Sequence, residues 1–315
     1  MEYLTVQQTA IKWGVSDRMV RYYCTNGLVP GARQEGKSWM VPASATKPNL
    51  NDSTKEKVEL PPLARKLKNQ QKKRNYHGLY DYTILNLTYS SCRMASSRLT
   101  RAQVENIIKK GKAQATFEPI KISDLIETRN HVECVNLILI APMEPLTTKY
   151  IKDLHRKLCA GTVDEQRDLV AAGTFRRPKA KIKGRSIPPA KDISVKLEGL
   201  IRGYEEKEKI DLQDILDFHV QFERIVPFDD GNGRVGRLIL FKECLRHDVM
   251  PFIIDDKRRS RYLDGLREWD ESWDALLEVA LEAQQRYAAQ IELQKLMAAN
   301  REFLPANYVD GEERL

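Results

Sequence analysis

Apolar residues recur at helical spacing over most of the chain beyond residue 100, which predicts a mainly α-helical protein. Thr100 is placed to cap a helix over residues 101–110, and Gly111 to end it. The same pattern predicts further helices over 123–140, 148–159, 190–205, 211–225, 235–247, 257–268 and 272–298. An all-α domain is therefore expected, interrupted only at residues 172–182.

The first 45 residues follow a different pattern. Thr5 is placed to cap a short amphipathic helix, and Ser16 caps a second one over residues 17–24, after a turn at Gly14. Two short helices joined by a Gly-containing turn are typical of a helix-turn-helix. Residues 32–41 are then predicted to form a small hairpin.

These patterns predict four segments. Residues 1–45 form the helix-turn-helix unit, and the Pro-, Ser- and Asn-containing residues 46–60 form a linker. Residues 61–300 form the helical domain, beginning with a basic helical extension, and residues 301–315 form a tail. A chain of 315 residues is long enough for one substantial core and a smaller module.

Composition indicates the cellular compartment and the partners to expect. The five cysteines are scattered, no apolar run is long enough to span a membrane, and the start lacks a signal-peptide pattern. We therefore expect a cytoplasmic protein without a membrane partner. The formal net charge is +8, with basic runs at 65–74 and 176–185. Such runs permit nucleic-acid contact, but they are more often a solvated face.

The strongest chemical signal lies at residues 226–237, which read VPFDDGNGRVGR and precede an apolar helical run. Gly231 and Gly233 allow close backbone approach at a helix N-terminus, where unpaired N–H groups bind phosphate. Asp230 offers an oxygen for a divalent metal, and Arg234 and Arg237 can hold phosphate oxygens. A polar loop that merely caps a buried helix is the alternative.

This stretch resembles the Fic signature, His-Pro-Phe-x-Asp/Glu-Gly-Asn-Gly-Arg-x-x-Arg, at every specified position except the first. The resemblance extends over about residues 80–285. It implies an all-α Fic core that transfers AMP from Mg²⁺–ATP to a protein hydroxyl. It also implies that Asn232 belongs to the site and that Tyr262 lies near the adenine; packing in the core is the alternative for Tyr262.

The first signature position departs from the family. Val226 stands where the family has the histidine that takes the proton from the target hydroxyl. Loss of a general base costs about 10²–10⁴-fold in rate. His219 lies seven residues earlier, roughly 10 Å along a helix, and is expected to be structural. The resemblance therefore predicts nucleotide binding with little transfer, whether the change is natural or engineered.

A second departure concerns the family's inhibitory segment, Ser/Thr-x-x-x-Glu-Gly/Asn. Its counterpart here begins at Ser91, with Ala95 at the Glu position and Ser96 at the Gly/Asn position. Alanine cannot pair with Arg237, so that arginine is expected to be free for a γ-phosphate. An ordinary Ser-rich loop is the alternative.

Residues 172–182 lie where Fic proteins place the flap, a β-hairpin that pairs with an extended target segment. By this resemblance Thr174, Phe175 and Arg176 belong to the target-binding flap, and the neighbouring basic residues favour an acidic partner. A plain surface hairpin is the alternative.

The N-terminal unit resembles the winged helix-turn-helix of MerR and excisionase proteins, whose second helix enters the major groove. The resemblance implies that duplex DNA meets Ser16, Arg18, Arg21, Tyr22, Arg33 and Lys37. The alternative is a protein-interaction module.

The leading hypothesis is thus a Fic-type protein adenylyltransferase scaffold that is impaired at Val226. One alternative is a nucleotide-sensing, DNA-binding regulator built on a degenerate Fic domain. Another is a pure interaction module in which the flap holds a peptide.

Overall fold

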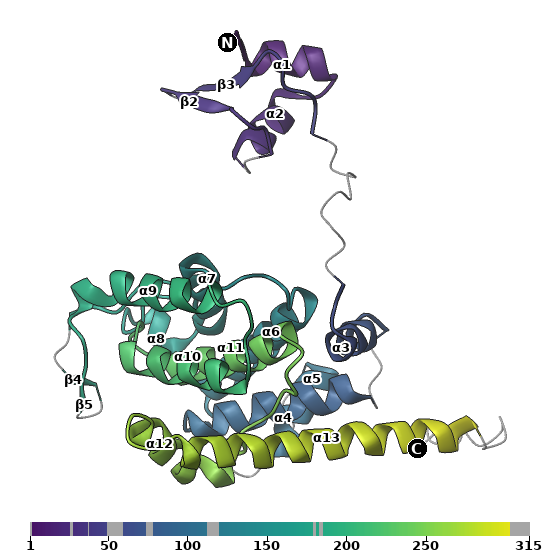
Figure 1. Cartoon of the computed structure of the whole chain (residues 1–315), viewed down its shortest axis with the longest axis vertical. Helices are drawn as coiled ribbons and strands as arrows, with labels where there is room; N and C mark the ends of the chain where they lie inside the picture. Colours follow the sequence, from purple (N-terminus) through teal and green to yellow (C-terminus); the bar gives the residue numbers. More distant parts are fainter. Residues whose placement is uncertain are drawn as a thin grey trace. The chain divides into compact units, whose positions relative to one another are not determined.

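The computed structural model describes residues 2–25, 28–36, 38–48, 59–73, 78–111, 120–178, 181–182 and 185–302. The chain divides into two compact units, residues 1–59 and residues 60–315 (Figure 1). The division falls inside the segment 46–60 that was predicted as a linker, of which residues 49–58 lie outside the described residues. The predicted tail is described only as far as residue 302.

The first unit packs two helices, α1 (Val6–Trp13) and α2 (Asp17–Thr25), with a small antiparallel sheet. The sheet has the order β1 (Tyr3–Thr5), β3 (Ser38–Pro42), β2 (Arg33–Glu35). Thr5 starts α1 with a reciprocal capping box, and Gly14 ends it at φ 62°. Both predicted helices and the hairpin are confirmed. The three residues of β1 are too few to show an alternating pattern, so this strand was not predicted.

The second unit is mainly helical, as predicted. Its helices are α3 (Pro62–Lys73), α4 (Leu79–Met94), α5 (Arg101–Lys110), α6 (Ile122–Ile140), α7 (Thr148–Cys159), α8 (Val163–Gln166), α9 (Ile193–Glu205), α10 (Leu212–Ile225), α11 (Asn232–Arg246), α12 (Arg259–Glu268) and α13 (Asp274–Glu302). Short 3₁₀ turns, η1 (Ala190–Asp192) and η2 (Asp256–Arg258), precede α9 and α12. Strands β4 (Lys181–Ile182) and β5 (Arg185–Ser186) form a two-stranded hairpin.

Helix α11 is the centre of this unit. It packs against α3, α4, α6, α7 and α10, and Leu238, Phe241 and Cys244 are completely buried. Residues on all sides of α11 are buried, and its first two turns carry the arginines of the signature, Arg234 and Arg237.

Within the part of the chain that the structure describes, every helix is too short or too polar to span a membrane.

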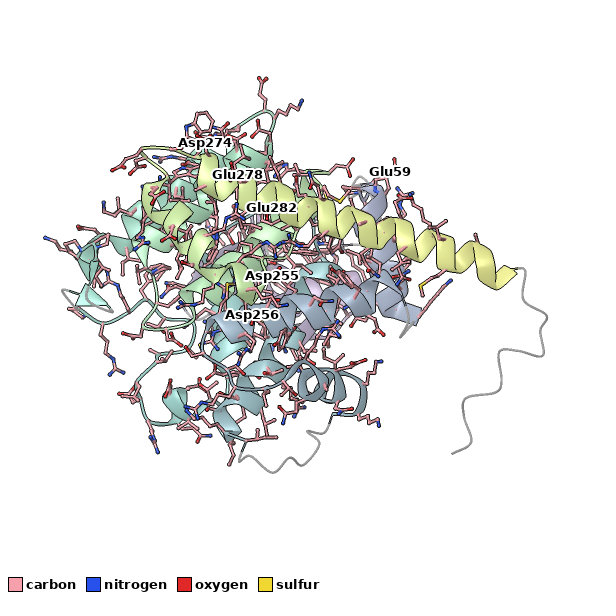
Figure 2. All side chains as sticks on the ribbon, turned by 90° about the horizontal axis from the view of Figure 1, so that it is seen from below. Glu59, Asp255, Asp256, Asp274, Glu278 and Glu282 are labelled. Carbon is pink, nitrogen blue, oxygen red and sulfur yellow. The ribbon has the colours of Figure 1, made fainter. Side chains whose placement is uncertain are left out.

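Ion pairs join α13 to the segment that carries α12. Arg261 pairs with Glu278 at 3.2 Å and with Glu282 at 3.0 Å, and Arg258 pairs with Glu282 at 3.1 Å. Both glutamates lie along α13 (Figure 2). Exposed pairs of this kind stabilise a protein by at most about 1 kcal/mol each. Their effect here is to hold α12 beside the candidate site.

The structure decides one alternative and shifts one predicted segment. Residues 91–94, the start of the proposed inhibitory segment, form the last turn of α4, so the alternative of a Ser-rich loop is wrong for these residues. The hairpin pairs Lys181 with Ser186 and Ile182 with Arg185, so it begins near the end of the predicted segment 172–182. Residues 174–176 therefore precede the hairpin.

Candidate functional site

The signature loop connects α10 to α11. Val226 ends α10 in the left-handed conformation, at φ 47° and ψ 63°, and Gly231 precedes α11 at φ 78°. The amide of Asn232 closes the loop, since its Oδ1 accepts from Phe228 N at 2.9 Å and its Nδ2 donates to Phe228 O at 2.8 Å. Asn232 thus shapes the loop and also lines the pocket beside it.

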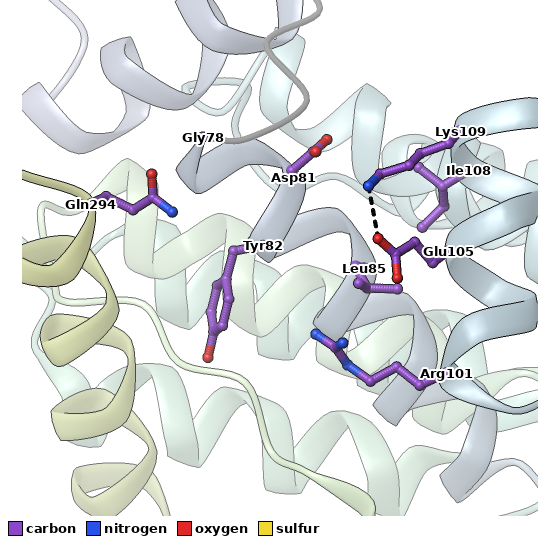
Figure 3. A pocket seen from close by; sticks show the side chains of 9 residues that line it. All are labelled: Gly78, Asp81, Tyr82, Leu85, Arg101, Glu105, Ile108, Lys109 and Gln294. Atoms are coloured by element: carbon purple, nitrogen blue, oxygen red, sulfur yellow. Dashed lines mark hydrogen bonds and ion pairs between the residues drawn. The ribbon is translucent and has the colours of Figure 1, made fainter. Parts of the chain in front are cut away.

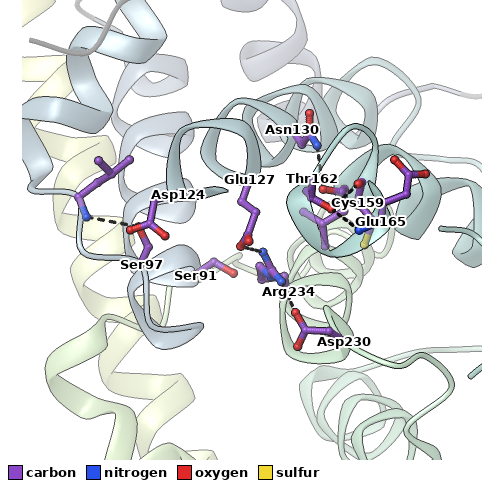
Figure 4. A network of polar contacts seen from close by, with 12 residues as sticks. Ser91, Ser97, Asp124, Glu127, Asn130, Cys159, Thr162, Glu165, Asp230 and Arg234 are labelled. Atoms are coloured by element: carbon purple, nitrogen blue, oxygen red, sulfur yellow. Dashed lines mark hydrogen bonds and ion pairs between the residues drawn. The ribbon is translucent and has the colours of Figure 1, made fainter. Parts of the chain in front are cut away.

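Arg234 is committed to two carboxylates. It is 5% exposed, its Nη2 donates to Asp230 at 2.7 Å, and its Nη1 donates to Glu127 of α6 (Figure 4). Burial disfavours the charge of Arg234, but Glu127 and Asp230 together hold its pKa above the ordinary value. Arg234 therefore anchors the loop to α6 as well as lining the pocket.

Arg237 is held by α4. It is 7% exposed, and it donates from Nε to Ser91 Oγ at 3.0 Å and from Nη2 to Ser91 O at 3.1 Å. The sequence predicted that Arg237 is free to bind a γ-phosphate. This prediction is wrong for Nε and Nη2, which both donate to Ser91. A Cβ on Gly233 would lie 2.8 Å from Arg237 Nη1, so a glycine is needed there to let the guanidinium approach the loop.

The end of α4 forms one wall of the site. Ala95 lies one turn after Ser91 and lines the same pocket as Arg237. Ser96 adopts φ 77°, a left-handed conformation that Gly and Asn accept most readily. The predicted alignment puts Ser96 at the Gly/Asn position of the family's segment, and this backbone geometry is compatible with that prediction.

The loop, α4 and α12 enclose a cavity of about 440 Å³. This volume lies within the range of small-molecule sites, about 300–1,000 Å³. Beside the signature loop the lining is polar and includes Asp230, Gly231 and Arg237. Elsewhere the lining combines apolar or aromatic residues with charged ones. The former are Met94, Ile187, Tyr262, Leu263 and Leu266, and the latter are Glu223, Arg224 and Arg259. Tyr262 is 2% exposed, so it is a core residue whose edge also meets the cavity.

No histidine is among the residues that line this cavity in the described structure. His219 is 1% exposed and its Nε2 lies 2.7 Å from the Tyr262 hydroxyl. Burial, aided by the charge of Arg237, lowers the pKa of His219 to about 3. Neutral and enclosed, it has the structural role expected for it.

His155 of α7 contacts the signature loop through its ring and through both ring nitrogens. Its ring stacks on Phe228 at 3.8 Å between centroids, and its Nδ1 accepts from Gly173 N at 2.9 Å. The proton therefore lies on Nε2, which is 3.1 Å from Asp230 O. Burial is the main cause that lowers the pKa of His155 to about 4, so the ring is neutral and both nitrogens are engaged.

Arg176 holds the loop from the side of the flap segment. Its Nε donates to Val226 O at 2.8 Å, its backbone N donates to Pro227 O at 2.9 Å, and its Nη2 donates to Pro188 O. Arg176 is 3% exposed, so its side chain faces inward and not toward a docked target. Phe175 likewise packs near Phe228, at 6.3 Å between ring centroids. Residues 174–176 are not among those that line the cavity.

A second, smaller pocket of about 210 Å³ lies apart from the signature loop. It is formed by α4, α5 and the far end of α13, with Tyr82, Arg101 and Gln294 in its lining (Figure 3). Lys109 in this pocket already pairs with Glu105 at 2.7 Å. It contains none of the predicted site residues.

In the first unit, the predicted DNA-facing side chains of α2 are exposed. Arg18, Arg21 and Tyr22 follow at helical spacing, and Ser16 Oγ accepts from Met19 N at 3.4 Å at the start of the helix. Arg33 is held by Glu35 at 2.7 Å and lies over the Tyr3 ring. Lys37 lies outside the described residues.

Sequence reasoning missed Glu127, His155 and the inward role of Arg176. Glu127 is one acidic residue among several on α6, and it meets Arg234 from 107 positions away. Nothing in local spacing distinguishes such a contact. The sequence also did not predict that Leu263 and Leu266 of α12 line the cavity, although it did single out Tyr262.

One family model matches the part of the chain that carries the signature loop. Residues 145–243, from just before α7 to within α11, match the model of the Fic/DOC family. The chain contains a Fic/DOC domain. The signature loop, the stacked His155 and both signature arginines all lie inside the matched residues.

Curated relatives carry the same domain. "Protein adenylyltransferase Fic" of Culex quinquefasciatus is 26% identical over 187 residues, which is 58% of this chain and 36% of that protein. The protein of the same name from Aedes aegypti is 24% identical over 186 residues, again 58% of this chain and 36% of the relative. The chain thus matches only about a third of the length of these relatives.

Solved structures show the same fold. A Fic domain containing signaling protein from Bacteroides thetaiotaomicron superposes with a TM-score of 0.58 at 19% identity, covering 75% of this chain and 90% of the other. Fic-1 (residues 134–508) from C. elegans superposes with a TM-score of 0.59 at 18% identity, covering 75% of each chain. At this identity the likeness supports the Fic fold and no more.

Proposed function

We propose that the Fic domain of this chain binds ATP with magnesium in the cavity beside the signature loop. We further propose that it is a protein adenylyltransferase scaffold whose transfer step is impaired. The observation that carries the proposal is a cavity lined together by Gly231, Arg234, Arg237 and Val226. The names of the matched relatives support the reaction class.

Phosphate recognition follows from the start of α11. The first N–H groups of a helix lack partners within the helix, and the helix dipole favours an anion at that end. Gly231 and Gly233 keep this end open, and Arg237 supplies a fixed cation. The apolar wall with Leu263 and Leu266 offers a surface for a flat nucleobase, with Tyr262 at its edge.

The residues present suit a magnesium ion. The Asp230 carboxylate is half-exposed, lines the cavity and uses its Oδ2 on Arg234 at 2.7 Å, which leaves Oδ1 toward other partners. Magnesium prefers one or two carboxylate oxygens together with substrate phosphates. Asp230 would hold the ion, which when bound neutralises negative charge on the phosphates.

The proposed impairment of AMP transfer follows from the bond changes and the proton transfer that the reaction requires. A target hydroxyl forms a new bond to the α-phosphorus, the bond to the β-phosphate oxygen breaks, and the hydroxyl proton must pass to a base. The hydrocarbon side chain of Val226 lines the cavity at the family's base position and accepts no proton. His155 and His219 are buried and bonded elsewhere, so neither replaces it.

A gain-of-function experiment tests the proposal. Val226→His should raise transfer of radiolabel from α-labelled ATP, onto the protein itself or onto lysate proteins, by about 10²–10⁴-fold. Val226→Asn is the matched control, because it also suits the left-handed backbone but supplies no base. If Val226→His binds Mg²⁺–ATP but transfers no more label than Val226→Asn, the proposed reaction is wrong.

One observation favours a second function for the first unit. Arg18, Arg21 and Tyr22 form one exposed face of α2, which is the arrangement expected of a recognition helix. We propose that this face contacts duplex DNA, and that nucleotide in the Fic domain modulates the contact. Coupling between sites is reciprocal, so Mg²⁺–ATP should change DNA affinity by the same factor as DNA changes ATP affinity. Unchanged DNA affinity in Arg18→Gln/Arg21→Gln would contradict the contact.

A further inference from the structure

Helix α3 carries a concentration of positive charge that the Fic site does not use. Its twelve residues include five cations and no acid, the cations being Arg65, Lys66, Lys68, Lys72 and Lys73. Most other cations on surface helices of this unit have acidic neighbours. Lys149, for example, pairs with Asp153 at 2.6 Å and Lys157 pairs with Glu133 at 3.6 Å.

The inner face of α3 is fixed by packing. Ala64 and Leu67 are buried in the core of the second unit. Gln71 donates to Asn136 Oδ1 at 2.9 Å, and Gln70 Oε1 accepts from Tyr80 N at 2.9 Å. With 3.6 residues per turn, the cations must then occupy the outer arc of the helix.

The outer arc is accessible, and its four lysines have no acidic partner among the described residues. Lys72 and Lys73 are exposed, and Lys66 and Lys68 are half-buried along the two edges of the arc. Within the part of the chain that the structure describes, none of these four lysines forms an ion pair. Arg65 differs, because its Nη2 donates to Leu60 O at 3.0 Å.

We propose that the outer face of α3 is a second contact surface for duplex nucleic acid, binding the phosphate backbone through Lys66, Lys68, Lys72 and Lys73. This proposal rests on the DNA contact proposed for the first unit. Lysine ammonium groups on a rigid helix suit phosphates, and such contacts add affinity and orientation without reading sequence.

Other polyanions fit less well. A helix that binds a membrane surface inserts an apolar face, but Ala64 and Leu67 of α3 are buried in the protein and Leu63 packs against the same core. Single-stranded nucleic acid is held by stacking on aromatic side chains, and α3 contains none. A duplex backbone needs neither feature.

The two units belong to one chain. Residue 48 is the last residue that the structure describes before residue 59, where the first unit ends. A chain segment of eleven residues spans at most about 40 Å. A duplex bound by the first unit is therefore tethered to the second unit, which raises the effective concentration of phosphates available to α3.

The test compares two quadruple variants of the full-length chain. One carries Lys66→Gln, Lys68→Gln, Lys72→Gln and Lys73→Gln. The matched control replaces four exposed lysines elsewhere, Lys110, Lys191, Lys196 and Lys209, with glutamine. Each variant lowers the formal net charge of +8 by four, so the two variants lose the same charge at different positions. Thermal unfolding checks that both variants fold.

Affinity for a fluorescein-labelled 30-base-pair duplex is measured by anisotropy between 50 and 200 mM NaCl. Each phosphate contact contributes about 0.9 to the slope of log K against log salt. The α3 variant should lose about 3 in slope and at least tenfold in affinity at 100 mM NaCl, while the control loses less than 1 in slope.

Three results would overturn the proposal. Equal slopes in the two variants would show that α3 has no special role, and no binding by the wild type at 50 mM NaCl would remove both DNA contacts. Binding that depends on α3 but occurs on phosphatidylserine vesicles and not on the duplex would assign the surface to a membrane. Arg18→Gln/Arg21→Gln serves as the separate test of the first unit. If Arg18→Gln/Arg21→Gln binds the duplex like the wild type while the α3 variant binds it more weakly, the contact proposed for α2 is wrong and the contact proposed for α3 stands.

Discussion

Val226 combines a β-branched side chain with a left-handed backbone, and replacing it should stabilise the protein. At φ 47° the Cβ crowds the following carbonyl, and β-branched residues tolerate this least. Asn and His accept the same conformation more readily. We therefore expect both Val226→Asn and Val226→His to be more stable than the wild type, independent of any gain in chemistry.

The magnitude follows from two opposing effects. The left-handed conformation costs an L-residue about 1–2 kcal/mol, of which a tolerant residue recovers roughly 1 kcal/mol. Against this, Val226 is only half-buried at the cavity, and an Asn or His side chain keeps part of its contact area, so the loss stays below about 0.8 kcal/mol, roughly half the value of a fully buried valine. The net gain should be about 0.2–1 kcal/mol, which raises Tm by roughly 0.5–4 °C for a domain of this size.

Differential scanning calorimetry of the full-length chain measures the transition of the second unit. Val226→Ile is the control, because it keeps the β-branch and the backbone strain and should unfold within about 1 °C of the wild type. A fall of several degrees in both Val226→Asn and Val226→His, with Val226→Ile unchanged, would show that the isopropyl group matters more than the backbone.

Three further predictions concern the core and the cavity. Lys242 and Glu243 form a fully buried pair at 2.6 Å, so Glu243→Gln should lower the free energy of unfolding in urea by about 3–5 kcal/mol, and adding Lys242→Met should recover part of the loss. Because burial lowers the pKa of His219 from 6.5 to about 3, the unfolded chain binds more protons than the folded one between these values. Stability should therefore fall below pH 6.5, by up to about 1.4 kcal/mol per pH unit for this residue, and Tm in His219→Gln should depend less on pH between 7 and 5. Ala95→Glu places a carboxylate one turn beyond Ser91, where it can pair with Arg237, and should weaken Mg²⁺–ATP binding about tenfold or more by calorimetry, whereas Ala95→Gln should weaken it less; equal binding in the two variants would contradict this.

Local signals in the sequence were enough to predict most helices. Thr100 and Asp211 both begin helices through reciprocal capping boxes, and Gly111 ends α5 at φ 63°. Each of these interactions joins residues within one turn of each other, so it is visible in a short stretch of sequence. The apolar run after Arg237 was also visible, because α11 is buried on all sides.

Helix α4 was not predicted from the sequence, for a physical reason. Its core-facing positions include polar residues, and Thr83, Thr88 and Ser91 are buried without forming an apolar stripe. Thr83 satisfies its hydroxyl locally by donating to Leu79 O at 2.7 Å. A helix of this composition lacks a clear periodic pattern, so its Ser-rich end resembled a loop.

The signature loop could be located from sequence, but the residues that hold it could not. Arg176 reaches Val226 O across 50 positions, and Glu127 reaches Arg234 across 107. Such contacts depend on how helices pack and not on any local spacing. For the same reason the sequence suggested that Arg176 faces a target, whereas the structure buries it beneath the loop.

Calorimetric titration with ATP and Mg²⁺ tests the central claim most directly. The full-length chain should bind one nucleotide per molecule, and Arg237→Gln should weaken that binding at least tenfold, since it removes one of the two buried arginines that line the cavity. Arg267→Gln changes the charge equally at an exposed position and should bind like the wild type. Absence of any saturable heat up to millimolar ATP, or equal binding in Arg237→Gln and the wild type, would contradict the account.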